Sequence, residues 1–189
     1  MDGQTPAADA PSRILDAAET LIIARGVTAL TLEAAAREAG VSKGGLLYHF
    51  ASKEALIEAL LRRLSAFITQ EFAACVAAQA EGPGRVARAM LEWGFGDSDL
   101  ACNERHQRAG AVFLAAFHHD PALLAPIRAV IADMRAAVAN DGLPPGHGAA
   151  IMAAGDGLFM ARLFSLYTPS AAELTEMRAA LSGLLGARP

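Results

Sequence analysis

The residues best suited to bind another molecule lie in one short segment, residues 42–53. Its sequence, Ser-Lys-Gly-Gly-Leu-Leu-Tyr-His-Phe-Ala-Ser-Lys, contains two lysines, a histidine and a tyrosine but no acidic residue, although the whole chain carries a net charge of -4. Gly44 and Gly45 leave the first turn without side chains, so a flat, negatively charged surface can approach the backbone closely. Lysine, tyrosine and histidine donate hydrogen bonds to phosphates and base edges. The segment therefore favours contact with DNA.

Two short helices are expected to position this segment. Thr31 is expected to cap the first, with Glu33 in its first turn, where an acidic side chain suits the helix dipole. Ser42 is expected to cap the second, over residues 43–49. A turn of three residues that includes Gly40 separates them, which is the spacing of a helix-turn-helix.

The second helix also needs apolar side chains that attach it to the rest of the head. Leu46, Leu47 and Phe50 are expected to supply this inward side. Two roles stay open for Leu46, which either contacts a thymine methyl group or fills space in the core.

Two longer helices are expected on either side of this motif. The first covers residues 12–25, with Ser12 as its cap and Gly26 after its end. The other has Ser52 as its expected cap and continues to about residue 79, which gives a rod of about 40 Å at 1.5 Å per residue. Since it is too long for a small three-helix head, we expect it to extend into a second domain.

The remaining sequence shows helical periodicity and no strand alternation, so the fold is predicted to be all-α. Further helices are expected over residues 85–95, 103–118, 121–140, 146–166 and 170–185. The predicted organisation is a flexible arm over residues 1–11, a helix-turn-helix DNA-binding domain over 12–58, and an effector-binding and dimerisation domain over 59–189.

The helix expected over residues 146–166 is apolar around nearly its whole circumference. A helix without a polar face must be buried on most sides, and its many alanines and glycines allow another helix to approach closely. Together with residues 170–185, it is expected to form a four-helix interface with the same helices of a second subunit. The alternative is that both helices lie in the core of a single chain.

The composition is that of a globular protein. The chain has 189 residues, of which 53% are hydrophobic, and contains two cysteines, Cys75 and Cys102, expected to be buried thiols in a reducing compartment. No apolar run is long enough to span a membrane, and the N-terminus lacks the features of a signal peptide. A soluble, cytoplasmic protein without membrane contact is therefore expected.

Residues 31–57 resemble the DNA-binding head of the TetR family of bacterial transcriptional regulators. The resemblance begins at Ile14 and rests on the Gly40-Val41-Ser42-Lys43 turn, the Leu47-Tyr48-His49-Phe50 run and the Ser52-Lys53-Glu54 start. In this family, residues that match Thr31, Tyr48, His49 and Lys53 contact the phosphate backbone, and those that match Lys43, Gly44 and Gly45 enter the major groove. With Ser42, which caps the recognition helix, these eight residues form the predicted DNA-binding set.

The resemblance also implies that the C-terminal domain holds a pocket for a small apolar or cationic effector. The predicted lining residues are Met90, Trp93, Phe113, Phe117, His118, Met134, Asp156 and Phe159, with Arg105 and His106 as further polar candidates. Two roles stay open for Asp156, the acidic residue of a long apolar helix: a structural hydrogen bond or salt bridge, or neutralisation of a cationic ligand.

The function implied by the resemblance is that of a homodimeric regulator, more often a repressor than an activator, which an effector releases from a double-stranded DNA operator. The alternatives are an effector-blind DNA-binding protein and a helical ligand-binding module that does not bind DNA. No catalytic motif is present, and no cofactor is expected. Because neighbouring residues on a helix point about 100° apart, His118 and His119 do not suit joint ligation of a metal ion.

Overall fold

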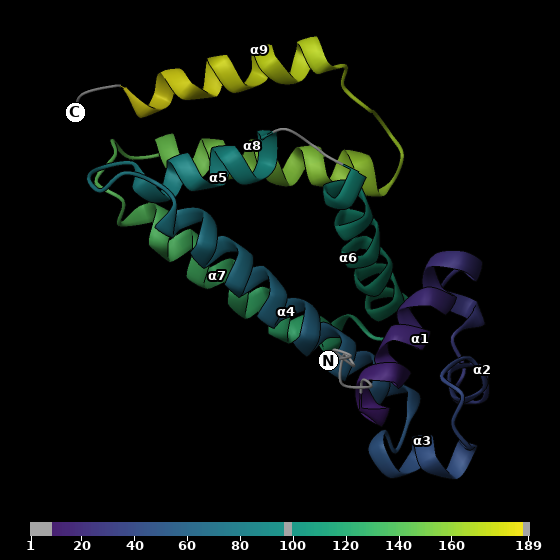
Figure 1. Cartoon of the computed structure of the whole chain (residues 1–189). Coiled ribbons are helices and arrows are strands. Elements are labelled where there is room, and N and C mark those ends of the chain that lie inside the picture. The colour runs from purple at the N-terminus through teal and green to yellow at the C-terminus, as the bar shows by residue number, and fades with distance from the viewer. Residues whose placement is uncertain (1–8, 97–99, 187–189) are drawn as a thin grey trace, which may run out of the picture. The chain divides into compact units, whose positions relative to one another are not determined.

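The computed structural model describes residues 9–96 and 100–186, without the side chains of residues 100–107 (Figure 1). Within these ranges the chain is helical and contains no strand, which confirms the predicted all-α fold. The α-helices are α1 (Ala10–Arg25), α2 (Leu32–Glu38), α3 (Lys43–His49), α4 (Lys53–Ala77), α5 (Arg85–Phe95), α6 (Leu100–His119), α7 (Ala125–Ala139), α8 (His147–Leu163) and α9 (Ala171–Ser182). Three short 3-10 segments are η1 (Val27–Ala29), η2 (Pro121–Leu124) and η3 (Gly183–Leu185). No helix of the described ranges combines the length and apolar character needed to cross a membrane.

The chain divides into two compact units. Unit 1 contains the residues up to Leu64 and the segment Gln107–Pro126, and unit 2 contains Ser65–His106 and the residues from Ile127 onward. Helices α4 and α6 each contribute residues to both units.

The core of unit 1 holds the first three helices together with the start of α4. Helix α1 packs against both α2 and α3, and α2 packs against α3. The fully buried side chains include Ile14 of α1, Leu46 of α3 and Leu60 of α4. Gly26 and Gly40, which follow α1 and α2, have φ values of 80° and 66°, a region that glycine adopts without strain. These two glycines let the chain turn sharply between the three helices.

Helix α1 begins two residues earlier than predicted, and its cap is Asp9 instead of Ser12. The Asp9 carboxylate accepts a hydrogen bond of 3.0 Å from the Ser12 N–H. Pro11 fits within the first turn because the N–H it lacks has no partner inside a helix at that position. The proline therefore belongs to the helix and does not precede it.

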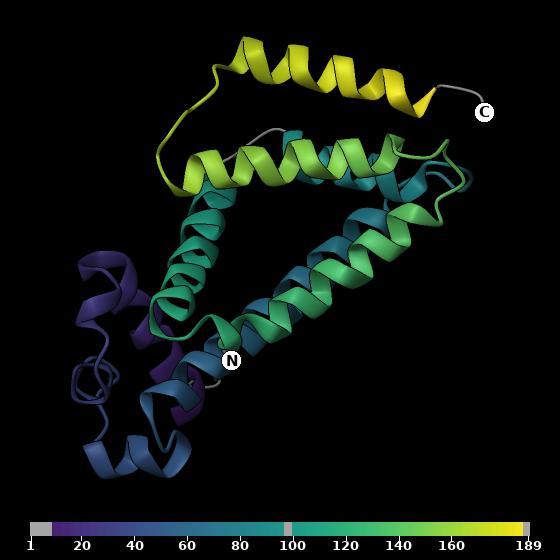
Figure 2. The same ribbon diagram turned by 180° about the vertical axis from the view of Figure 1, so that it is seen from behind.

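Unit 2 is built around the pairing of α5 with α8, which run side by side in both views (Figure 1, and from behind in Figure 2). An added Cβ on Gly94 would lie 3.4 Å from the Cα atom of Gly155, so these glycines mark a close approach of the two helices. Helix α9 packs against α5, and Arg178 forms an ion pair with Glu92 across that contact. Met90, Met134, Ile151 and Leu158 are among the side chains of the buried core.

A buried carboxylate, Asp141, fixes the start of α5 from a distant loop. The residue that precedes α5, Gly84, offers no side chain as a cap, and the two oxygens of Asp141 accept hydrogen bonds from the N–H groups of Val86 (2.9 Å) and Ala87 (2.8 Å). The backbone carbonyl of Asp141 also accepts a bond of 2.7 Å from Gly84. Asp141 therefore acts as the N-cap of α5, a role that sequence inspection missed because 55 residues separate Asp141 from Val86.

Other helix boundaries also differ from the predicted ones. Helix α6 begins at Leu100, three residues before the predicted start, and α9 ends at Ser182, where η3 continues to the predicted end. The helix expected over residues 121–140 is divided into η2 and α7, because Pro126 has no N–H for the bond that a continuous α-helix requires there. Helix α4 ends at Ala77, and α8 ends at Leu163, although the apolar pattern continues to Leu166. Ser165 just after α8 has a positive φ of 53°, which ends the helix inside that apolar run.

Candidate nucleic-acid interface and ligand-binding region

Helix α3 is attached to unit 1 along one side and exposed along the other. Ser42 caps it as predicted, and its hydroxyl accepts a 3.0 Å hydrogen bond from the Gly45 N–H. Leu46 and Phe50 are buried, whereas Tyr48 is 86% exposed. A Cβ added to Gly44 would meet no heavy atom nearer than 4.0 Å, so the backbone is open to an approaching surface there.

The prediction for Leu47 is wrong, and the open question about Leu46 is resolved. Leu46 is fully buried and fills the core, so it is not available to a thymine methyl group. Leu47 is 38% exposed and does not supply the inward side of the helix. Residues four positions apart lie on the same face of a helix, and Leu46 and Phe50 are the two that face the core here. Leu47 points about 100° away from Leu46 and therefore lies on another face.

The other predicted phosphate contacts lie at the starts of α2 and α4. Thr31 caps α2 as predicted, with its hydroxyl 3.1 Å from the Ala34 N–H, and its side chain is exposed. Ser52 caps α4 in the same way, at 3.2 Å from the Ala55 N–H, and Lys53 beside it is half-buried. Lys43 and His49 of α3 are both exposed. Unit 1 thus holds all eight predicted DNA-binding residues.

Two carboxylates lie close to the segment that contains no acid of its own. Glu33 of α2 pairs with Lys43 at 2.5 Å, and the hydrogen bond from Lys43 lowers the pKa of Glu33. Glu54 pairs with His119, the last residue of α6, at 2.6 Å. Hydrogen bonds from the Ser52 hydroxyl, the Glu54 backbone and the His119 ring lower the pKa of Glu54 to about 2. Lys43 of residues 42–53 is therefore paired with an acid of α2, whereas Glu54, which directly follows the segment, is paired with α6.

The predicted effector-binding residues are distributed over both units. Met90, Trp93, Met134, Asp156 and Phe159 belong to unit 2, and Phe113, Phe117 and His118 belong to unit 1. Their surroundings differ as well, since Met90 and Met134 are buried in the core of unit 2 and Phe117 is 62% exposed. The side chains of Arg105, His106 and Cys102 lie outside the described residues, and Cys75, expected to be buried, is only partly so.

Two features of unit 2 fit a ligand with an aromatic ring and a positive charge. Trp93 packs against Phe72 of α4 with the ring centroids 6.2 Å apart. Asp156 is exposed in the single chain, but partial desolvation by neighbouring atoms raises the pKa of its carboxyl, and the charge of Arg135 partly opposes this effect. Within the part of the chain that the structure describes, the Asp156 carboxylate has no hydrogen-bond or ion-pair partner, so the structural bond considered for it is absent there.

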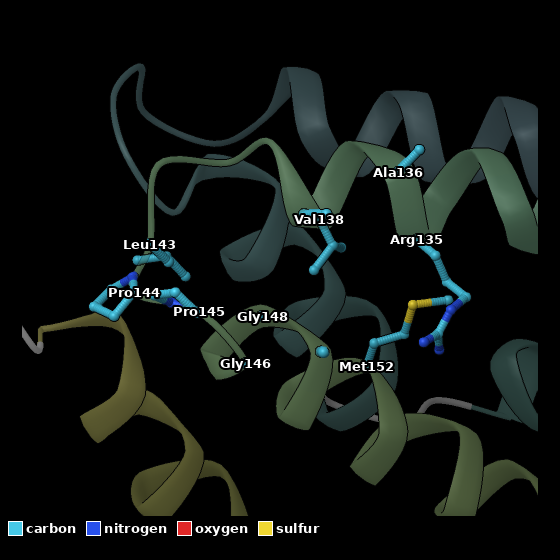
Figure 3. Close-up of a pocket in the computed structure, with 11 residues that line it drawn as sticks. Arg135, Ala136, Val138, Leu143, Pro144, Pro145, Gly146, Gly148 and Met152 are labelled. Atoms are coloured by element: carbon cyan, nitrogen blue, oxygen red, sulfur yellow. The ribbon is translucent and has the colours of Figure 1, made fainter. Parts of the chain in front are cut away.

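The described residues also surround two hollows. One, of about 550 Å³, lies in unit 2 between α7 and the start of α8, where Arg135, Val138, Leu143 and Met152 are among its lining residues (Figure 3). None of the predicted effector-binding residues lines it. The other, of about 480 Å³, lies in unit 1 and includes Phe117 and His118 in its lining.

Comparison with known families and proteins gives matches over both regions. Residues 14–60 match the family described as "Bacterial regulatory proteins, tetR family", and residues 84–186 match "Tetracyclin repressor-like, C-terminal domain". The HTH-type transcriptional regulator SrpR of Pseudomonas putida is 43% identical over 49 residues, which cover 26% of this chain and 23% of SrpR. The regulator TtgW, also of Pseudomonas putida, is equally similar, and the match covers 37% of its length. The chain therefore matches well under half of the length of these curated relatives.

Solved structures are similar over nearly the whole chain. The multidrug binding protein EbrR, complexed with malachite green, is 28% identical with a TM-score of 0.64, over 95% of this chain and 100% of that one. EbrR complexed with ethidium is 27% identical with a TM-score of 0.62 over the same shares of the two chains. A TetR-family member from Streptomyces coelicolor A3 is 28% identical with a TM-score of 0.64, again over 95% and 100%.

Proposed function

The chain belongs to the TetR family of bacterial transcriptional regulators, and we propose that it is a repressor that binds a double-stranded DNA operator as a homodimer. A small molecule bound in the C-terminal domain then releases it from the operator. As a regulator of transcription it acts in the cytoplasm, where bacterial DNA lies. The observation that carries this proposal is the exposed polar side of α3, which two buried side chains hold in place.

In this proposal α3 enters the major groove and neighbouring residues hold the phosphates. Lys43 donates to base edges, and Gly44 and Gly45 allow the backbone to come close. Tyr48 and His49 of α3, with Thr31 and Lys53 outside it, donate to phosphate oxygens and fix the orientation of the head. These contacts make affinity fall as salt rises, because each neutralised phosphate releases counterions.

The homodimer is supported by an uncovered stripe along α8 and the residue that follows it. Ala149, Ala153, Gly157, Met160 and Phe164 recur every three or four residues, and all five are exposed in the single chain. If α8 only completed the core of its own chain, this stripe would be covered. A second copy would bury it and set two α3 helices against successive major grooves of a pseudo-palindromic operator.

The effector in this proposal is a flat aromatic cation. The Phe72–Trp93 pair offers aromatic surface, and the Asp156 carboxylate offers a negative charge that has no ion-pair partner among the described side chains, although Arg135 acts on it electrostatically. The complexes of EbrR with malachite green and ethidium, both aromatic cations, support the same class of ligand. Effector and operator then weaken each other's binding by the same factor.

An effector-blind DNA-binding protein is the second candidate. It is favoured by Met90 and Met134, which were predicted to line a pocket and are buried in the core of unit 2. The third possibility, a ligand-binding module that does not bind DNA, has no observation of this kind in its favour.

Binding of the full-length protein to DNA tests the proposal. Fluorescence anisotropy with the DNA upstream of its own gene is compared with a random duplex of equal length, at several salt concentrations. We expect affinity for the upstream DNA to be about a thousandfold higher or more, with a marked loss as salt rises. Equal affinity for both duplexes contradicts the proposal.

Ethidium titration then separates the two leading candidates. We expect ethidium to bind the free protein and to weaken its binding to the upstream DNA. Specific DNA binding that ethidium does not weaken favours the effector-blind protein. Malachite green is the second probe, and it too must leave DNA binding unchanged for that conclusion.

A further inference from the structure

The pair formed by Lys43 and Glu33 joins the recognition helix to the helix before it. The Lys43 Nζ atom lies 2.5 Å from a Glu33 carboxylate oxygen, and the two side chains are 58% and 59% exposed. Glu33 comes from the first turn of α2, which begins after Thr31, and Lys43 is the first residue of α3. An ammonium and a carboxylate are therefore presented together beside the bare turn at Gly44.

Both partners keep free hydrogen-bonding capacity in this pair. A lysine ammonium has three N–H donors, so Lys43 retains two after the bond to Glu33. An ionised carboxylate has about four acceptor positions, so Glu33 retains most of its own. The hydrogen bond from Lys43 lowers the pKa of Glu33, which keeps the carboxylate ionised and able to accept. Together they offer two donors with an acceptor next to them.

A G·C base pair presents the complementary order in the major groove. Guanine offers two neighbouring acceptors, N7 and O6, and the cytosine N4 amino group follows as a donor. O6 and N4 are hydrogen-bonded to each other, about 2.9 Å apart, which is close to the 2.5 Å between Lys43 and Glu33. An A·T pair places its donor between two acceptors, so Lys43 would reach only one acceptor while Glu33 held the donor.

We propose that Glu33 is a specificity-determining residue that reads a G·C base pair of the operator together with Lys43. Lys43 donates to O6 and N7 of the guanine, and Glu33 accepts from the N4 amino group of the paired cytosine. This inference rests on the proposed operator binding. It goes beyond that function because it assigns an acidic residue to the interface and specifies the base pair that it recognises.

The carboxylate has a second consequence for binding to other sequences. A negative charge at a surface that meets phosphates weakens binding to any DNA, and only a base with a suitable donor compensates for it. Since the ion pair is exposed, its contribution to folding stability is small, so removal of Glu33 leaves the fold intact. An effect of Glu33→Ala on base preference is therefore separable from an effect on folding.

Selection of binding sites from randomised duplexes by the full-length protein tests the inference. The wild type is expected to enrich a motif with a G·C pair at one position of each half-site. E33A removes the acceptor oxygens, so it is expected to keep the rest of the motif and to lose preference at that pair. E38A, which removes an exposed acid at the other end of α2, is the matched control and is expected to keep the whole motif.

A modified base then tests the contact itself. Replacement of the cytosine by 2-pyrimidinone removes the N4 amino group, and we expect a loss of about tenfold in wild-type affinity and no loss for E33A, which has no side-chain acceptor. Equal losses for the two proteins overturn the inference, as does a wild-type motif in which E33A changes nothing. If the wild type enriches no motif at all, the proposed operator binding fails and the inference fails with it. Circular dichroism melting of E33A controls for folding.

Discussion

Helix α3 is proposed to bind DNA and helix α8 to bind a second copy of the chain, and the exposed sides of the two helices differ in polarity. Helix α3 has seven residues and an exposed polar side, and it is anchored by buried Leu46 and by Phe50, the residue that follows it. Helix α8 has seventeen residues and almost no polar side chain, and a stripe of it remains uncovered in the single chain. A DNA-binding surface can be identified by its exposed hydrogen-bond donors, which contact phosphates and bases. A dimer surface can be identified by apolar residues that stay exposed in the single chain.

The largest expected effect tests how α3 is anchored. Leu46→Ala removes a fully buried side chain, and we expect a loss of about 2–5 kcal/mol in the free energy of unfolding. Leu47→Ala is the matched control on the neighbouring residue, with an expected change below about 0.5 kcal/mol because Leu47 is exposed. Urea unfolding followed by circular dichroism measures both. Equal losses would mean that the two leucines share the anchoring role.

A change in unit 2 comes next. Asp141→Ala removes the cap of α5 and leaves the N–H groups of Val86 and Ala87 without their partners, which we expect to cost about 2 kcal/mol of stability. Asp133→Ala, at an exposed position of α7, removes the same charge without a cap and is expected to change little. The same unfolding measurement applies. An Asp141→Ala variant as stable as the wild type would show that the backbone contacts of the loop are sufficient to hold the start of α5.

The stripe on α8 is tested without disturbing the fold of the chain. A Cβ added to Gly157 meets nothing within 4 Å, so Gly157→Glu is tolerated by the single chain but buries a charge in the proposed dimer. We expect the dimer to dissociate at concentrations at least about tenfold higher than for the wild type, measured by analytical ultracentrifugation. Ala73→Glu, on an exposed position of α4, is the control. An unchanged dimer would place the interface elsewhere.

The charge of Asp156 gives a pH dependence with a defined sign. Partial desolvation raises the pKa of this exposed carboxyl, so it ionises at higher pH than an ordinary aspartate, and ethidium is expected to bind more tightly as pH rises through that range. Asp156→Asn is expected to bind ethidium about tenfold more weakly at neutral pH and to lose this part of the pH dependence. Fluorescence titration across pH reports both. A wild-type affinity that is flat with pH would remove Asp156 from the proposed site.

The smallest expected effect concerns the Glu54–His119 pair of unit 1. The pKa of Glu54 falls from 4.5 to about 2 in the folded chain, so its contribution to stability is fully present above about pH 4.5 and is lost as pH falls toward 2. Glu54→Gln is expected to flatten the acid side of the stability profile slightly, because the group is exposed and screened by solvent. Thermal melting between pH 2 and 6 measures the difference. A steeper acid profile in the variant would contradict this account.

The sequence was most informative where structure is decided locally. Thr31, Ser42 and Ser52 cap their helices as predicted, because a cap depends on residues within one turn. The bounds of α3 agree with the predicted ones for the same reason. Leu46 and Leu47 were harder, because both are apolar and only the packing of α3 distinguishes the buried one from the exposed one.

Features made by distant residues could not be predicted from local patterns. Asp141 caps α5 across 55 positions, and the pair of Glu54 with His119 spans 65. Glu33 was expected only to suit the dipole of α2, and its contact with Lys43 depends on the angle between α2 and α3. The predicted effector-binding residues were selected by residue type, and the structure divides them between the two units.

The most direct test of the central claim, that α3 reads bases while its neighbours hold phosphates, compares Lys43→Ala with Lys53→Ala. Affinity is measured for the selected operator, for the operator with one base pair changed, and for random duplex, across a range of salt. We expect Lys43→Ala to lose about 1–3 kcal/mol on the operator and to discriminate less between the duplexes. Lys53→Ala should weaken all three alike and reduce the salt slope by about one. Equal losses on every duplex for both variants would contradict the account.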